Sequence, residues 1–220
     1  MRWNLAESLL LLALDDLEGK VRGGFPLDVG LAAAELLDAA GRERVKVEGW
    51  RIEVLDDSPT GDMDLDRVLT GVARHARVYR KPILLGAWLE QRRGAVRSVY
   101  LKRLQRGGAV CHTRRRVLGL IPVHRYLLCD FEATAEPWKR LGLAAETGWC
   151  LDHEAAALAS LAYITGLGRF LYPGREGAGS REVLSTLAQA GRAPEPLAAI
   201  LEGTVYQIEA IVTAAAQSCR

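Results

Sequence analysis

Glycine- and proline-rich breaks cut this 220-residue chain into short segments, and most of the segments repeat apolar residues at the spacing of a helix. We predict helices over residues 5–17, 29–40, 63–76, 83–92, 96–106, 138–147, 153–165, 181–190 and 197–216. Apolar residues between 45 and 54, and again between 109 and 128, predict two small β-hairpins. The chain therefore favours a mainly α fold: a compact multi-helix single domain, residues 1–220, with two small β-hairpins.

Side chains suited to capping mark several of the expected helix starts. Asn4, with Glu7 three residues later, is close to a capping box, and Asp28 can cap the helix that follows it. The stretch Ser58–Asp62 is dense in turn formers and lacks the repeated glycines of a phosphate-binding loop. We interpret it as a structural turn that places Asp62 near the start of the next helix.

The charge of the chain is strongly uneven. Between Arg74 and Arg116 there are thirteen Lys or Arg and one acidic residue, Glu90, a net charge of +12; the other residues hold 16 basic and 26 acidic side chains, a net −10. Concentrated positive charge attracts anionic partners. Arg93 and Arg97 are four residues apart, so they share a helix face, and arginine suits phosphate. The window predicts an anion-binding surface; a solvated basic helix, neutralised by the acidic remainder, is the alternative.

Composition argues against several classes of protein. No stretch reaches the ~18 apolar residues that span a bilayer, and the run Leu9–Leu14 is too short and too acidic in its flanks for a signal peptide or an anchor. The four cysteines form no CxxC pair, so we expect reduced thiols in a cytoplasmic protein. Cys111-His112 and His124…Cys129 match no metal module, and we expect no metal or other cofactor. Only five of the 29 basic residues are Lys, which with many Ala and Gly indicates a GC-rich bacterial genome.

The sequence shows no constellation typical of an enzyme. It has no nucleophile–base–orienter set, no nucleotide fingerprint and no carboxylate pair at useful spacing. Asp152-His153-Glu154 could be acid/base machinery, but an acid-rich helix start explains these residues better. We therefore expect a binding protein rather than an enzyme.

One binding function that the pattern suggests is DNA binding. The helix over 83–92, a break at Arg93-Gly94, the helix over 96–106 and the basic hairpin after it have the order of a winged helix-turn-helix. Helix 96–106 would then enter the major groove with its arginines facing outward. Nucleic acid therefore stays an open alternative to other anionic partners.

Several segments, in the same order, resemble the Golgi phosphoprotein 3 family. The most specific is the proline-threonine-glycine-aspartate turn Pro59–Asp62, which opens a helix. The other matching segments are Leu5–Gly19, Gly30–Arg42, Leu104–Val110, and Leu118–Pro122 before Arg125-Tyr126. Family members are peripheral membrane proteins that bind phosphatidylinositol 4-phosphate and help retain glycosyltransferases in the Golgi, and bacterial homologues are common. The resemblance implies a cytoplasmic, peripherally membrane-associated adaptor whose partners are anionic membrane lipids and the cytosolic tails of membrane proteins.

The resemblance also implies a lipid headgroup site. The family uses an aromatic residue before its second helix, an arginine within that helix, and two arginines on the helix before the second hairpin. These positions fall on Phe25, Ala32, Gly94 and Arg97, with Arg93 beside Gly94. Two of the family's arginines are therefore missing. The headgroup or anion-binding residues that we expect are Phe25, Arg93, Arg97 and Arg106, and we expect the Arg97 side chain to be exposed.

The hairpin over 109–128 is a second expected contact. Three basic residues lie at or near its turn and apolar residues follow them: Arg114, Arg115, Arg116, Leu118, Leu120 and Ile121. Apolar residues beside basic ones suit membrane insertion or a contact between subunits. The family uses this hairpin for both, so a homo-oligomer through residues 109–128 is one expectation. An ordinary strand packed on the core is the alternative.

Overall fold

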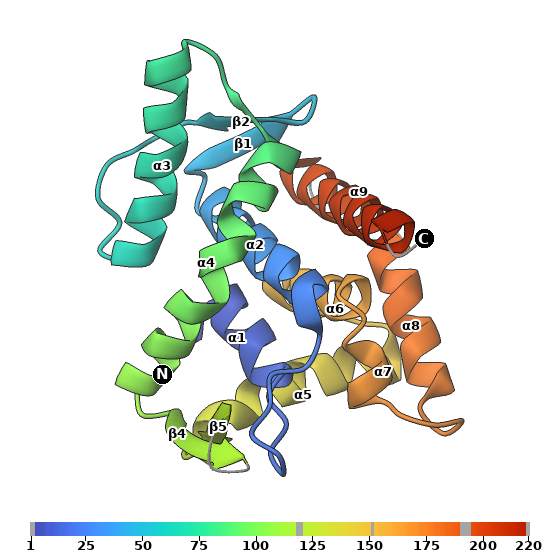
Figure 1. The fold of residues 1–220 in the computed structure, drawn as a ribbon. Helices are drawn as coiled ribbons and strands as arrows, with labels where there is room; N and C mark the ends of the chain where they lie inside the picture. The colour runs from blue at the N-terminus through green and yellow to red at the C-terminus, as the bar shows by residue number, and fades with distance from the viewer. Residues whose placement is uncertain (1–2, 118–120, 151, 190–194, 219–220) are drawn as a thin grey trace.

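The computed structural model describes residues 3–117, 121–150, 152–189 and 195–218. The helices in these ranges are α1 Leu5–Leu12, α2 Gly24–Gly41, α3 Met63–Tyr79, α4 Leu85–Arg106, α5 Phe131–Thr147, α6 His153–Ile164, α7 Gly168–Leu171, α8 Ala178–Gln189 and α9 Glu195–Ser218. The strands are β1 Val45–Glu48, β2 Arg51–Val54, β3 Ile83–Leu84, β4 Val110–Val117 and β5 Ile121–Leu128. They form two antiparallel sheets, β1-β2-β3 and β4-β5 (Figure 1). The predicted mainly α fold with two small β-hairpins is confirmed, and β3 adds a third strand to the first hairpin.

Helices α1 and α2 form the centre of the core. All eight residues of α1 are buried, because the sequence LAESLLLL is apolar on nearly every face. Helices α4, α5, α6 and α9 pack around this central pair (Figure 1). Gly30 is needed where α2 passes the end of α6, since a Cβ at position 30 would lie 2.3 Å from Cγ2 of Thr165.

Two of the three helix caps predicted from the sequence are present in the structure. The capping box of α1 is confirmed: Glu7 N–H donates to Oδ1 of Asn4 (2.8 Å), and Asn4 N–H donates to Oε2 of Glu7 (3.0 Å). Asp62 is the N-cap of α3, also as predicted. The prediction that Asp28 caps the second helix is wrong, because α2 already begins at Gly24. Asp28 therefore lies inside the helix, where its carboxylate is free to bind a neighbouring helix.

Helix α4 is a single helix of 22 residues, which corrects the predicted break at Arg93-Gly94. Gly94 lies on the exposed surface of this helix, and a Cβ there would meet no heavy atom within 4 Å. Glycine in a helix interior costs about 1 kcal/mol relative to alanine, which the packing of α4 against α2 and α9 outweighs. A helix-turn-helix needs a turn at this point, so the predicted DNA-binding motif is not formed.

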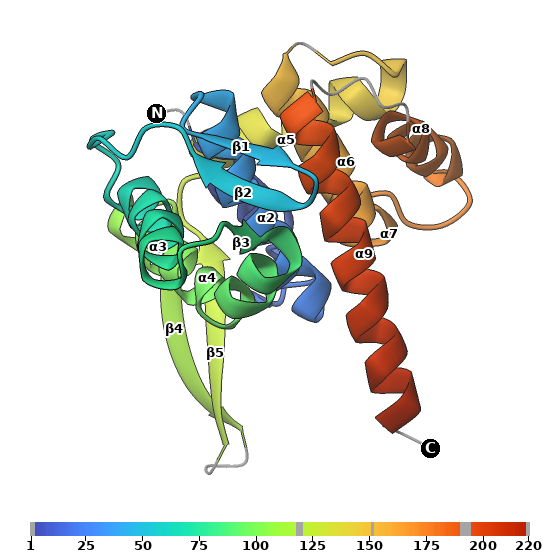
Figure 2. The ribbon, with the colours of Figure 1, turned by 90° about the horizontal axis from the view of Figure 1, so that it is seen from above.

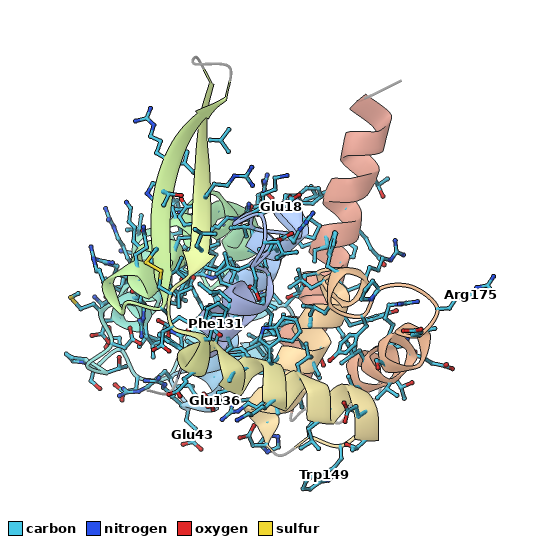
Figure 3. All side chains as sticks on the ribbon, turned by 90° about the horizontal axis from the view of Figure 1, so that it is seen from below. Glu18, Glu43, Phe131, Glu136, Trp149 and Arg175 are labelled. Atoms are coloured by element: carbon cyan, nitrogen blue, oxygen red, sulfur yellow. A yellow bond between two sulfur atoms is a disulfide. The ribbon has the colours of Figure 1, made fainter. Side chains whose placement is uncertain are left out.

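The hairpin β4–β5 projects from the body, and the C-terminal half of α9 projects in the same direction (Figures 2 and 3). The two strands pair from Val110↔Leu128 to Val117↔Ile121. A disulfide joins Cys111 to Cys129 across the base of the hairpin, with 5.9 Å between their Cα atoms. The expectation that all four cysteines are reduced thiols is therefore wrong for this pair, because strand pairing brings residues 18 apart in sequence within bonding reach.

Candidate anion-binding surface

Three of the expected headgroup residues come together where α2 begins beside the middle of α4. The Arg97 guanidinium donates from Nε to Oδ1 of Asp28 (2.7 Å) and from Nη2 to the carbonyl of Gly24. Phe25, the next residue after Gly24, is half-buried in the same first turn of α2, and Arg93 lies one helical turn before Arg97 on α4. The structure therefore unites Phe25, Arg93 and Arg97 in one place.

Carboxylates neutralise both arginines beside the start of α2, and the sequence did not indicate these ion pairs. Arg97 is half-buried against Asp28, so the expectation of an exposed Arg97 is wrong. Arg93 forms two bonds to the carboxylate of Glu90 (2.8 and 2.5 Å). Burial raises the pKa of Asp28, although the charge of Arg97 opposes that rise. A phosphate at this place would have to displace Asp28 or Glu90 from its arginine.

The two missing family arginines differ in what the fold allows. Ala32 is 0% exposed in the core of α2, so the placement of the family's second-helix arginine at position 32, which the resemblance implied, is wrong. Gly94 is exposed and faces open space, so an arginine would fit there. The headgroup site of the family can therefore be rebuilt at only one of these two positions.

Two other arginines of the basic window bind carboxylates at the core and are not part of the free basic surface. Arg103 donates to Oε1 of Glu7 (2.7 Å) and to both carboxylate oxygens of Asp62 (2.7 and 2.9 Å). It thereby ties the capping residues of α1 and α3 to α4. Arg92 binds both oxygens of Glu35 at 2.7 Å each, and the Glu35 side chain is only 1% exposed. Sequence analysis missed this role, although an acid inside an apolar helix, such as Glu7 or Glu35, is a signal that a buried partner is required.

Six of the nine remaining cations of the window form two separate groups. The hairpin basic group is Lys102, Arg106 and Arg114; the α3-end group is Arg74, Arg80 and Lys81. All six side chains are exposed, and within the described part of the chain none of them forms an ion pair. Lys102 and Arg106 lie in the last turns of α4, whereas Arg80 and Lys81 precede its first turn, and α4 itself is about 33 Å long at a rise of 1.5 Å per residue. Only the first group adjoins the projecting hairpin.

The other expected contact residues lie at the end of α4 and on the hairpin β4–β5. Arg106 follows Arg97 by nine residues, about 13 Å along α4, so it belongs with the hairpin and not with Phe25. Arg114 is exposed on β4, opposite His124 of β5. Arg115 and Arg116 continue β4 toward the tip, and Ile121 begins β5. The predictions for Leu118 and Leu120 lie outside the described residues.

A cleft of about 780 Å³ lies at the C-terminal end of α2, with Leu37, Asp38 and His153 in its lining. Glu43, another lining residue, lies on the side of the body away from the hairpin (Figure 3). Burial raises the pKa of Asp38 to about 7, while a hydrogen bond from the backbone N–H of Leu5 (3.2 Å) opposes the rise. Asp38 is therefore a carboxyl group whose ionisation works against folding.

We expect Asp38→Asn to raise the free energy of unfolding by up to about 4 kcal/mol near pH 8 and to change it little near pH 4. Because the folded state holds the Asp38 proton more tightly than the unfolded state, stability is lost as pH rises from the ordinary pKa of 3.8 to about 7. Asparagine keeps an acceptor for Leu5 N–H without the charge. Urea unfolding of both proteins across this pH range measures the difference, and a difference that does not vary with pH would contradict the assignment.

Taken by its fold, the chain is a mainly helical domain in which a long helix leads into a projecting, basic β-hairpin. Among the helices of the described residues, none combines the length and hydropathy needed to cross a bilayer. A sequence profile of the family described as Golgi phosphoprotein 3 (GPP34) matches residues 5–205, nearly the whole chain. The chain belongs to the Golgi phosphoprotein 3 family, as its motifs predicted, and this membership suggests an adaptor. A search of curated proteins found no match.

Proposed function

We propose that the protein is a peripheral membrane adaptor that binds anionic lipid through the hairpin basic group. Its family, which supplies the general expectation, is shown by the match over residues 5–205. The observation that carries the proposal is the position of Lys102, Arg106 and Arg114: three exposed cations, without an ion pair to a described residue, on the end of α4 and on the first strand of the projecting hairpin. Near an anionic leaflet each contributes about 1 kcal/mol.

The lipid is selected mainly by charge. A phosphoinositide such as phosphatidylinositol 4-phosphate fits the proposal because its headgroup is highly charged. The family's compact headgroup site is not the main contact, since Asp28 and Glu90 already neutralise Arg97 and Arg93. Other acidic lipids therefore bind to a comparable degree at equal charge.

In this proposal the hairpin and the opposite side of the body bind different partners. The hairpin contacts the membrane or a second copy of the chain, and the body presents its other side to the cytosolic tail of a membrane protein. No chemical step is part of this function. Localisation is cytoplasmic, at the inner surface of a membrane.

Sedimentation with vesicles tests the proposal. We expect the protein to sediment with phosphatidylcholine vesicles that contain phosphatidylserine or phosphatidylinositol 4-phosphate, and not with phosphatidylcholine alone. Binding should weaken between low and physiological salt, because exposed charges are screened over ~8–10 Å. Equal sedimentation with neutral vesicles would overturn the electrostatic account. Duplex DNA added as a competitor separates the alternatives: preferential binding to DNA in place of the acidic vesicles would favour nucleic acid as the partner.

A further inference from the structure

A groove of about 780 Å³ lies between the start of α2, the turn from α6 to α7, and α9. Its apolar wall consists of Tyr163, Ile164, Phe170, Val205 and Ile208. Phe170 is 54% exposed and Tyr163 39% exposed, and both rings line this one groove. The volume lies within the range of roughly 300–1,000 Å³ that is common for small-ligand sites. The groove is therefore large enough, and apolar enough, for a hydrocarbon chain.

The polar groups around the groove favour an anionic end on such a ligand. Arg169 is exposed and forms no ion pair with a described residue. Arg181 donates to the backbone carbonyls of Tyr172 and Gly174 and forms no ion pair with a described residue. Glu209 of α9 is the one carboxylate in the described lining, so the two arginines outweigh it.

The start of α2 adds to this positive end of the groove. Gly23 and Gly24 line the groove, and the N-cap residue Gly23 provides no side-chain acceptor for the first N–H groups of α2. An 18-residue helix presents partial positive charge at such an end. Arg22 lies with its guanidinium 5.7 Å from the centre of the Phe170 ring, but Asp15 and Glu18 already pair with its charge, so Arg22 packs on the aromatic wall without adding free positive charge.

The groove is also placed for contact with a membrane. One of its walls is α9, and this helix continues past Glu209 in the direction in which the hairpin projects (Figures 2 and 3). Arg97 contacts Gly24, a residue of the groove lining, so the groove and the place where α2 meets α4 share the first turn of α2. The groove therefore adjoins the place where α2 meets α4, about 13 Å along α4 from Arg106 of the hairpin basic group.

We propose that this groove takes the acyl chain of one anionic lipid or lysolipid, with the phosphate beside Arg169 and the start of α2. The inference rests on the proposed binding to anionic membranes for the source of its ligand. Each methylene that leaves water contributes about 0.8 kcal/mol. The apolar wall therefore supplies affinity that a soluble phosphate cannot gain.

Isothermal titration calorimetry with monomeric oleoyl lysophosphatidic acid, below its micelle concentration, tests the proposal against glycerol 3-phosphate. We expect one lysophosphatidic acid per protein and binding of glycerol 3-phosphate at least about tenfold weaker, because two buried methylenes already give a factor of ten. Inorganic phosphate should bind no better than glycerol 3-phosphate. Equal affinity for the lysolipid and glycerol 3-phosphate, or uptake of many lysolipids per protein, would overturn the proposal.

Matched variants locate the binding. Phe170→Ser should weaken lysolipid binding about tenfold, whereas Tyr206→Ser, which removes a similarly exposed ring outside the groove, should not. Arg169→Gln should weaken it about fivefold, whereas Arg175→Gln, on a loop that points away from the body (Figure 3), should not. Equal effects within either pair would place the lysolipid elsewhere.

The outcome is separable from that of the proposed function. If wild-type protein sediments with anionic vesicles but takes up no monomeric lysolipid, the groove proposal fails and the surface proposal stands. If it takes up the lysolipid but ignores anionic vesicles, the surface proposal fails. A Phe170→Ser variant that changes the sedimentation coefficient instead of lysolipid affinity would show that the groove is an interface between copies of the chain, which also overturns the lipid proposal.

Discussion

Arg103→Ala is expected to lower the free energy of unfolding by about 3–5 kcal/mol, because it leaves two carboxylates without their cation. Glu7 is 3% exposed and Asp62 is half-buried, and both bind the same guanidinium. The pair caps α1 and α3, so their repulsion would act on two helix starts at once. Urea unfolding at neutral pH measures the loss.

The adjacent residue provides the control for this prediction. Lys102 is exposed and belongs to the hairpin basic group, so Lys102→Ala should change stability by no more than about 0.5 kcal/mol. The loss caused by Arg103→Ala should also shrink as pH falls, because Glu7, whose pKa is raised by burial, is then protonated and neutral. A loss under about 1 kcal/mol, or one that does not respond to pH, would show that Arg103 is not a structural cation.

Ala32→Arg is expected to unfold the domain or to cost several kcal/mol, since a charge would enter a fully buried position without a partner. Gly94→Arg restores the family's other arginine at an exposed position with open space around it. This second change should leave stability equal or raise it by up to about 1 kcal/mol, because it removes a glycine from a helix interior.

Thermal unfolding of the two variants side by side decides between the positions. Gly94→Arg should bind anionic vesicles nearly as wild type, because position 94 lies about 18 Å along α4 from Arg106, beyond the screening length of exposed charges. A well-folded Ala32→Arg variant would contradict the packing of α2. A destabilised Gly94→Arg variant would contradict the continuous helix α4.

Elements with a local signal could be predicted from the sequence. The alternation in Val45–Val54 and the capping box of Asn4 and Glu7 depend on residues that are close in the chain, and both predictions are confirmed. The start of α2 was placed too late, because the Gly-Gly-Phe-Pro sequence is typical of a loop. A proline at position 26 is nevertheless tolerated in a first helical turn, where its missing N–H costs nothing.

The ion pairs that neutralise part of the candidate site could not be predicted, because they join residues that are far apart in the sequence. Asp28 and Arg97 are 69 residues apart, and Glu7 and Arg103 are 96 apart. Sequence alone located the basic window but not the acids that neutralise part of it. Which cations stay exposed is therefore a property of the tertiary structure, and it moves the proposed lipid contact from Arg93 and Arg97 to the base of the hairpin.

A vesicle-binding comparison of two triple variants tests this central claim most directly. One variant replaces the hairpin basic group, Lys102, Arg106 and Arg114, with glutamine; the other replaces the α3-end group, Arg74, Arg80 and Lys81. Both remove three exposed positive charges, so the net charge of the two proteins is the same. We predict that the hairpin variant loses about 3 kcal/mol of binding to phosphatidylserine vesicles, more than a hundredfold, and that the α3-end variant binds nearly as wild type. Equal losses would show a diffuse charge effect, and a larger loss in the α3-end variant would place the membrane contact at the opposite end of α4.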